Sequence, residues 1–492
     1  MENKKTGKII ALIVAIVIVV AGASVGVMAA RGVFSSGKQE AFDLLAQAGD
    51  KLSESPINDY LGYAELTKSM NEESSMIDMQ ISNLQLDPTI APTGVDLSEF
   101  TAELGSQYDV KEQKTNVTLN IAKGGSTLSA NIYEDKDKMI VSVPELVNGK
   151  VFQLDPKMGE SVSSQANMQT LPSEDIKEFQ EDIIEFFEKE IEKLKDDMSC
   201  EKLEDDKEGY QLTITKEAMD TMINDFVAFM EGQEKVVGWI NSYAKTLGQT
   251  LPSSNGTENF DLISGLKTIA EELSKYTQDF TFSVYGENGN LTGLETVIAV
   301  ENTPFTISLT FEGEKGNSTA TLKISGQDAS GTGSLTVVKK SMEGDTLDTA
   351  LTADLSVNDI SFGTLSFTES LSKADNGYSF IGTVSSMGSE LANFTCTGSV
   401  KDLKPGSYVD VILDDVSLEV QGKKLFSLAI DTKIGKLDGS VEPPEGETVE
   451  VKSLTDYAPY ATEIQMGIIK LMADWEISVP NLSDLTNLPN QS

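Results

Sequence analysis

The chain has 492 residues, with 78 acidic against 38 basic side chains and a formal net charge of −40 at pH 7. So acidic a surface repels nucleic acid and anionic lipid headgroups, and we expect no nucleic-acid partner. The chain has no histidine and its only arginine is Arg31, which excludes Ser-His-Asp and Cys-His catalysis, zinc and facial-triad iron sites, and bidentate arginine recognition of carboxylate or phosphate beyond that residue.

The chain begins with an uncharged apolar run at residues 9–30, preceded by three lysines. As a helix it would span roughly 33 Å, about the thickness of a bilayer's hydrocarbon layer. We therefore expect residues 1–31 to form a cytoplasmic tip and a single-pass transmembrane anchor, with the rest of the chain outside the cell membrane. The alternative is a secretory signal peptide cut after Ala29, which would release the protein.

The N-terminal half mixes both periodicities. Apolar residues at helical spacing predict a helix over residues 39–53, and alternation predicts a strand over residues 74–86. Further alternating segments with Gly-Gly and Asn-Gly turns predict a β-meander over residues 109–154. A helical insertion is expected at about residues 172–278. Its helices are expected at residues 173–195, 219–230 and within 258–278.

Period-two patterning dominates residues 279–434 and predicts a β-meander of about ten antiparallel strands, each with one apolar and one Ser/Thr side. Such strands are typical of a sheet that is wet on one face only. An acidic, proline-containing linker at residues 441–447 precedes a C-terminal helix expected at residues 459–475, with Pro459 in its first turn. The polar tail, residues 479–492, is expected to be disordered.

These elements predict an α+β fold. We expect a large curved antiparallel sheet, half-barrel-like, with the inserted and C-terminal helices covering its apolar face, and one N-terminal transmembrane helix besides. No linker is long enough to separate domains, so residues 32–478 are expected to form a single extracytoplasmic domain. Without helical cover, so many apolar strands would expose an aggregation-prone surface.

Two cysteines, Cys200 and Cys396, are 196 residues apart. Outside the cell they could form a disulfide, which would stabilise the fold by ~4 kcal/mol in the chain-entropy model. The alternative is two separate buried thiols, because Cys396 is in phase with the apolar side of its predicted strand.

The sequence offers no catalytic, cofactor or metal site. Neighbouring carboxylates fit solvated turns or bulges, and none has the spacing of a calcium loop. There is no glycine-rich phosphate loop. The carboxylate pairs are Asp135 with Asp137, Asp205 with Asp206, and Asp414 with Asp415.

Three stretches carry a resemblance: Lys4–Lys8 before the apolar run, Asp137–Pro144, and Tyr378–Ile434 with the helix after Pro444. They resemble membrane-anchored exported proteins of gut clostridia that share a domain of unknown function. More distantly, the layout resembles lipoprotein carriers and lipid-binding lipoproteins of the LolA and LppX kind. That resemblance implies a half-barrel whose helices close a hydrophobic cavity.

The leading hypothesis is a membrane-anchored, non-enzymatic protein that binds a lipid, a lipidated protein or another apolar ligand between sheet and helices. One alternative is a structural or interaction module of the cell envelope with a fully packed core. A remote alternative is a carboxylate-based hydrolase. The side chains expected to face an apolar ligand are Phe305, Ile307, Leu309, Phe311, Leu365 and Phe367.

Overall fold

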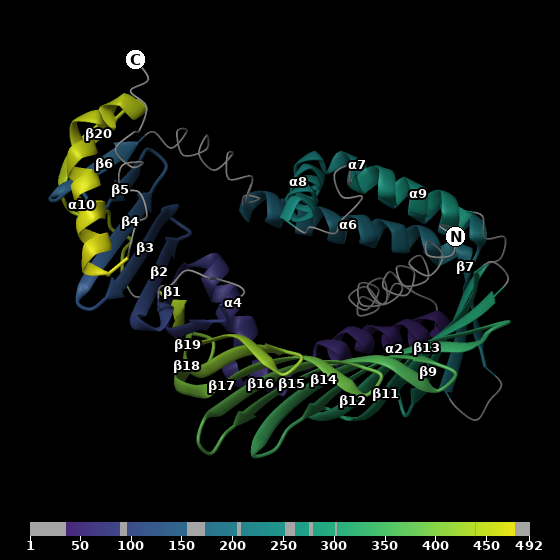
Figure 1. The fold of residues 1–492 in the computed structure, drawn as a ribbon. Helices are drawn as coiled ribbons and strands as arrows, with labels where there is room; N and C mark the ends of the chain where they lie inside the picture. Colours follow the sequence, from purple (N-terminus) through teal and green to yellow (C-terminus); the bar gives the residue numbers. More distant parts are fainter. Residues whose placement is uncertain are drawn as a thin grey trace.

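The computed structural model describes residues 36–88, 96–154, 173–203, 208–250, 261–274, 279–300, 303–437 and 439–477. Its strands form one 20-stranded sheet (Figure 1). The strands before the helical insertion are β1 (Ser74–Leu86), β2 (Phe100–Asp109), β3 (Lys114–Lys123), β4 (Ser126–Glu134), β5 (Met139–Ser142) and β6 (Lys150–Leu154). Those within and directly after it are β7 (Met198–Lys202), β8 (Glu208–Ile214), β9 (Phe280–Glu287), β10 (Asn290–Val300) and β11 (Thr303–Glu314). The remainder are β12 (Asn317–Asp328), β13 (Gly331–Met342), β14 (Thr346–Val357), β15 (Ile360–Ser372), β16 (Gly377–Ser386), β17 (Ser389–Lys404), β18 (Tyr408–Val420), β19 (Lys423–Lys436) and β20 (Glu447–Val451).

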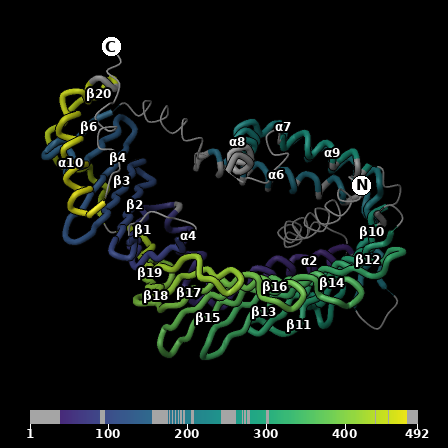
Figure 2. The backbone as a smooth tube through the Cα atoms, viewed as in Figure 1, coloured from purple at the N-terminus to yellow at the C-terminus, as the bar shows by residue number. Residues whose placement is uncertain are grey.

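The spatial order follows from the pairings. From β7 to β19 each strand pairs with the next in sequence, antiparallel throughout. The N-terminal strand β1 then pairs with β19, and β2 to β6 follow in order. The parallel pair of β6 with β20 completes the order. The backbone curves through a wide arc (Figure 2), as the accumulated twist of so many strands requires.

The fold class is therefore largely β, and the prediction of an α+β fold is wrong. The one sheet includes the N-terminal strands, the strands of the helical insertion and the C-terminal strand. Helices are few beside it. They are α2 (Ser36–Ser53), α3 (Pro56–Leu61), α4 (Tyr63–Glu72), α6 (Ser173–Asp197), α7 (Lys216–Gly232), α8 (Glu234–Thr250), α9 (Leu262–Ser274) and α10 (Ala461–Asp474), with 3-10 turns η1 (Leu97–Glu99) and η3 (Leu454–Tyr460).

No helix among the described residues is both long and apolar enough to cross a membrane. The expected anchor, residues 9–30, lies outside the described ranges, as does the tail at residues 479–492. The prediction of a single-pass, helix-anchored protein, with its cell-membrane or secreted localisation, is corrected to what the described residues show, a largely β protein in which no helix is able to span a membrane. The described helices are short or amphipathic elements of a β protein.

Helix α2 confirms the helix expected at residues 39–53 and forms the largest core. Its buried residues Phe42, Leu44 and Leu45 pack on strands β8 to β12, where Leu212, Val284 and the strand residues around them are buried. The cause is an apolar stripe at helical spacing that meets the apolar side of alternating strands.

Helices α3 and α4 follow without having been predicted. Ser55 caps α3, accepting a hydrogen bond from the Asn58 N–H, and Pro56 occupies its first position. Gly62 ends α3 in the left-handed conformation, and Ile57 is fully buried against β14, β15 and β17. The Ser-Pro start and the glycine end were the local signals of this short helix.

The inserted helices differ most from expectation. Helix α8 was missed, and α6 to α9 pack chiefly on one another, reaching the sheet mainly at β7. Their apolar stripes meet in an aromatic cluster, in which Phe186 stacks on Phe229 at 4.8 Å between ring centroids. In Figure 1 they lie as a separate layer above the sheet. The helices that cover the apolar face beyond β7 and β8 are instead α2 and α3, and α4 lies against β1 and β19.

The predicted C-terminal helix is confirmed as α10, which starts two residues later than expected and follows a 3-10 turn. This turn, η3, contains Pro459 and is capped by Ser453 and Asp456, and α10 follows from Ala461. Phe152 packs against Tyr457 and Tyr460 of η3, which fixes this end on β6. The expected linker at residues 441–447 is partly packed, since Val441 is buried against the β4–β6 core.

Candidate functional site: an uncovered apolar sheet face

One apolar row crosses ten strands on the face of the sheet that carries α2 and α3, called the helix-bearing face below. Because directly paired residues share a face, the register places these side chains side by side. The row runs from β9 to β18 through Val284, Leu294, Leu309, Leu322, Val337, Ala353, Leu365, Val384, Ala392 and Val420.

The row is covered at one end only. Under α2, Val284 is 0% and Leu309 5% exposed, whereas Leu365 and Val384, farther along the same row, are 38% and 40% exposed. A parallel row behaves alike: Ile307 is buried on β11, and Leu355 on β14 is 52% exposed. The apolar face therefore continues beyond its helical cover.

The cover provided by α2 stops at β13, because the chain at the end of α2 is hydrogen-bonded to side chains of this strand. The Lys339 ammonium donates to the Glu54 carbonyl oxygen at 2.7 Å and to the Leu52 carbonyl, and the Ser341 hydroxyl also donates to Glu54. The Glu54 carboxylate in turn accepts from the Ser318 hydroxyl at 2.5 Å and from the Gly316 N–H. Burial lowers the pKa of Lys339.

Helix α3 covers the neighbouring strands β14, β15 and β17 at the same edge of the sheet where α2 ends. There Ile57 packs against Leu347, Leu371 and Val400, all buried. The Tyr378 hydroxyl donates to Glu369 at 2.9 Å, and burial together with the Glu369 charge raises the pKa of Tyr378. The uncovered part of the face is thus bounded by α2 on one side and α3 on another.

Three phenylalanines cross this uncovered area. Phe367 stacks on Phe380 with ring centroids 5.8 Å apart, and Phe380 meets Phe394 edge-on at 6.0 Å. Gly382 lies between Phe367 and Phe394 in the sheet. A Cβ at this position would lie 2.9 Å from the Phe367 ring, so the glycine makes room for that ring. The surface is aromatic at its centre and aliphatic toward the strand ends.

The structure divides the six residues predicted to face an apolar ligand. Ile307, Leu309 and Phe311 are buried on the α2-covered side and belong to the core, while Phe305 is only partly buried. Leu365 and Phe367 lie on the uncovered face. The prediction missed Leu351, Leu355 and Val384, whose alternation is as clear in the sequence as that of the residues chosen.

The two cysteines are not joined. Cys200 lies on β7 and Cys396 on β17, with strands β8 to β16 between them in the sheet. Burial raises the pKa of both thiols.

The carboxylate pairs behave as turn and bulge residues where they are described. Asp135 accepts from the N–H groups of Asp137 and Lys138 and from the Tyr133 hydroxyl. Asp414 and Asp415 lie at a β-bulge of β18, and Asp205 and Asp206 lie outside the described ranges. Across those ranges, no group of three or more acidic or cysteine side chains is placed to hold a metal ion.

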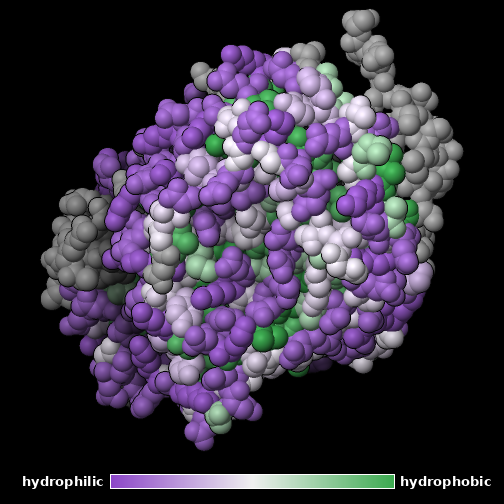
Figure 3. Space-filling view, turned by 90° about the vertical axis from the view of Figure 1, so that its left-hand side faces the viewer, coloured by the Kyte–Doolittle hydropathy of each residue, from purple (hydrophilic) through white to green (hydrophobic). Residues whose placement is uncertain are grey.

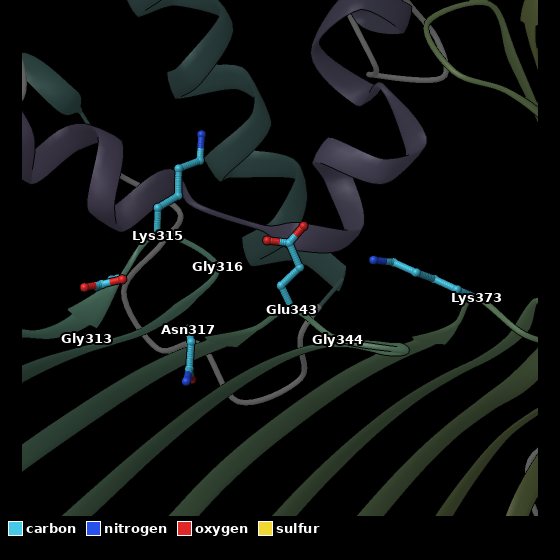
Figure 4. A pocket seen from close by; sticks show the side chains of 8 residues that line it. Gly313, Lys315, Gly316, Asn317, Glu343, Gly344 and Lys373 are labelled. Carbon is cyan, nitrogen blue, oxygen red and sulfur yellow. The ribbon is translucent and has the colours of Figure 1, made fainter.

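Two open hollows lie at the edge of the sheet that carries the turns at Gly316, Gly344 and Asn376, and the larger of these two is mainly polar. A hollow of about 620 Å³ is formed by three hairpin turns and contains Glu314, Lys315, Glu343 and Lys373 (Figure 4). Glu343 and Lys373 point toward one another across it, and Lys315 points up toward the helices. The second, of about 410 Å³, is lined mainly by serines, threonines and glycines around Tyr378. Neither hollow encloses an apolar chamber.

The side of the molecule shown in Figure 3 is mostly hydrophilic, with hydrophobic areas separated by polar ones. That agrees with the excess of acidic residues. The fold and this site together define a largely β protein with a partly covered apolar sheet face.

No known protein family matches the chain, and no curated protein does. Among solved structures it is similar to two Pseudomonas aeruginosa proteins. OccK11 (OpdR) is 6% identical with a TM-score of 0.22, covering 74% of this chain and 95% of that chain. OccK3 (OpdO) is 7% identical with a TM-score of 0.12, covering 76% and 98%. TM-scores this low do not indicate a shared fold with either protein. The resemblances drawn from the sequence stay predictions.

Proposed function

We propose that this protein is non-enzymatic and binds an elongated apolar ligand, such as the acyl chain of a lipid or of a lipidated protein, on the uncovered helix-bearing face. The observation that supports this most directly is the continuous row from buried Leu309 to half-exposed Leu365 and Val384. A ligand there extends an existing core.

Covering the exposed parts of Leu351, Leu355, Leu365 and Val384 removes apolar surface from water, at about 1 kcal/mol for each side chain. The three phenylalanines add contact area and edge-on or stacked surfaces for a methylene chain. No charged partner is needed, which suits a chain without histidine and with a single arginine.

The second candidate is a structural or interaction module of the cell envelope. The openness of the two hollows favours it, because neither hollow provides an enclosed apolar chamber. In that case another protein surface would cover the helix-bearing face.

Leu365→Asn separates the two candidates. The matched control is Ile381→Asn: Ile381 is on the neighbouring strand, is 40% exposed, and faces the opposite side of the sheet. We expect Leu365→Asn to weaken binding of a fluorescent long-chain fatty acid about tenfold, as the loss of one apolar contact implies, and Ile381→Asn to leave it unchanged. Native mass spectrometry and organic extraction of the purified protein should also yield a bound lipid. A wild-type protein that is lipid-free and does not bind the fatty acid contradicts the proposal.

A further inference from the structure

Four large apolar side chains stand exposed at one edge of the sheet, around the turns of the β14–β15 and β16–β17 hairpins. Met387 is 72% and Ile360 63% exposed, and Phe362 and Leu391 are exposed as well. These four residues are called the apolar tips. Because antiparallel strands turn at alternate edges, the two turns lie at the same edge. Two hairpins of matching colour project from the lower edge of the sheet in Figure 1.

The turn at Met387 is unfavourable for folding alone. Met387 has a φ of 49°, in the left-handed region, followed by Gly388 at 77°. A two-residue hairpin prefers Asn-Gly at such positions, and polar side chains hold the corresponding left-handed conformation in three other two-residue turns, at Asn288, Asn358 and Gln421. A long apolar side chain here costs backbone strain and gains no burial within the fold. Backbone strain at an exposed apolar residue indicates that its side chain contacts another molecule.

We infer that the apolar tips insert into a zwitterionic lipid surface. The tips project, so they require no complementary hollow in a partner, and a lipid layer accepts such a shape. The residues beside the tips are mostly serine, threonine and glycine, whose transfer into the headgroup region of a lipid layer costs little free energy. The acidic Asp359 and Glu390 beside them, with the net charge of −40, disfavour anionic lipid.

The tips are continuous with the uncovered face. Val357 precedes the β14–β15 turn and Val384 the β16–β17 turn; both are exposed, and both lie on the helix-bearing face. An acyl chain leaving the lipid surface would meet apolar side chains all the way to Leu365. The inference goes beyond the proposed function, since a ligand could bind the face from solution without any contact of the tips with lipid.

The experiment uses the full chain with an indole probe at the tips. Quenching of this probe reports insertion of the tips themselves and not of other apolar segments. Ile360→Trp places an indole at the tips; Val297→Trp places one at a site 59% exposed on β10, away from them. Phosphatidylcholine vesicles carrying brominated acyl chains quench an indole that inserts. We expect quenching for Ile360→Trp, none beyond the native background for Val297→Trp, and weaker quenching with phosphatidylglycerol.

A second substitution tests the side chain with the strained backbone. In the Ile360→Trp protein, Met387→Asp should weaken vesicle binding roughly tenfold, since an apolar contact is replaced by a charge. Aspartate tolerates the left-handed backbone, so folding is kept. The control is Met466→Asp on α10, whose methionine is 64% exposed.

Several results would overturn the inference. These are absence of quenching at Ile360→Trp, equal quenching at Val297→Trp, equal effects of Met387→Asp and Met466→Asp, or stronger binding to phosphatidylglycerol. Self-association that Met387→Asp abolishes without vesicles would assign the tips to a second copy of the chain. The Leu365→Asn measurement is independent, so loss of one result leaves the other standing.

Discussion

At the residue scale, single side chains fix the boundaries of the site. Lys339 lies on the same side of β13 as Val337 and holds the two carbonyls that end α2. Its ammonium is half-buried, and burial lowers its pKa, yet the two acceptors keep it in place. Glu54 binds Gly316 and Ser318 from the other side. These contacts set where the helical cover stops.

Replacing the lysine tests that role. Lys339→Met should lower the free energy of unfolding by about 1–3 kcal/mol, because it leaves the Leu52 and Glu54 carbonyls without this donor. Lys340→Met changes the next residue, which is exposed on the other face, and should cost less than about 0.5 kcal/mol. Urea unfolding measures both. Equal losses would show that the carbonyl contacts do not matter.

The other end of α2 predicts a pH dependence. The Tyr210 hydroxyl donates to Glu40 of α2, and this hydrogen bond, together with burial, raises the pKa of Tyr210 to about 12. Because an unfolded tyrosine has a pKa near 10, the contribution is complete below about pH 10 and is lost as pH rises toward 12. The unfolding free energy, measured between pH 9 and 12, should fall more steeply for wild type than for Tyr210→Phe. Parallel curves would contradict this.

At the element scale, the α3–α4 connection depends on one glycine. Gly62 has a φ of 64°, and a Cβ there would lie 2.4 Å from the Gly406 N atom of the β17–β18 turn. The close approach docks both helices beside the sheet. Neither helix was predicted from the sequence, since six- and ten-residue helices carry too few turns for a clear apolar period.

A pair of substitutions separates backbone conformation from crowding. Gly124 has a similar φ of 59°, but a Cβ added there would have no atom within 4 Å. Gly124→Ala should cost about 1–2 kcal/mol from the left-handed backbone alone. Gly62→Ala should cost clearly more, because the Gly406 backbone must move as well. Thermal unfolding compares the two. A similar shift in Tm for both would mean that the α3–α4 packing is loose.

At the scale of the whole molecule, connectivity decides what the apolar face does. The N-terminal strand β1 inserts beside β19, so that strands from opposite ends of the chain form one sheet. Helices α6 to α9, which were expected to close the face, pack chiefly on each other. Over β14 to β16, only the margin at Leu347 and Leu371 is covered, by α3, because α2 stops at β13.

The sequence by itself determined the local elements. Alternation set β1 at Ser74–Leu86 and the run of strands from Phe280 to Lys436, and helical spacing set α2, because these periods are properties of neighbouring residues. It also set the charge and the absence of histidine. Alternation also indicated which side of each strand is apolar, and it did so equally for Leu365 and Leu309.

Only the tertiary structure decided which of those apolar residues stay exposed. Leu309 and Leu365 have the same local pattern of alternation. Their exposure differs because α2 ends beside Lys339 of β13, while the apolar row continues across the next strands. The single sheet, and with it the largely β fold class, depends on pairings between residues as far apart as Ile77 and Ile434. Burial is a property of what lies above a residue, and that information is distributed over the whole chain.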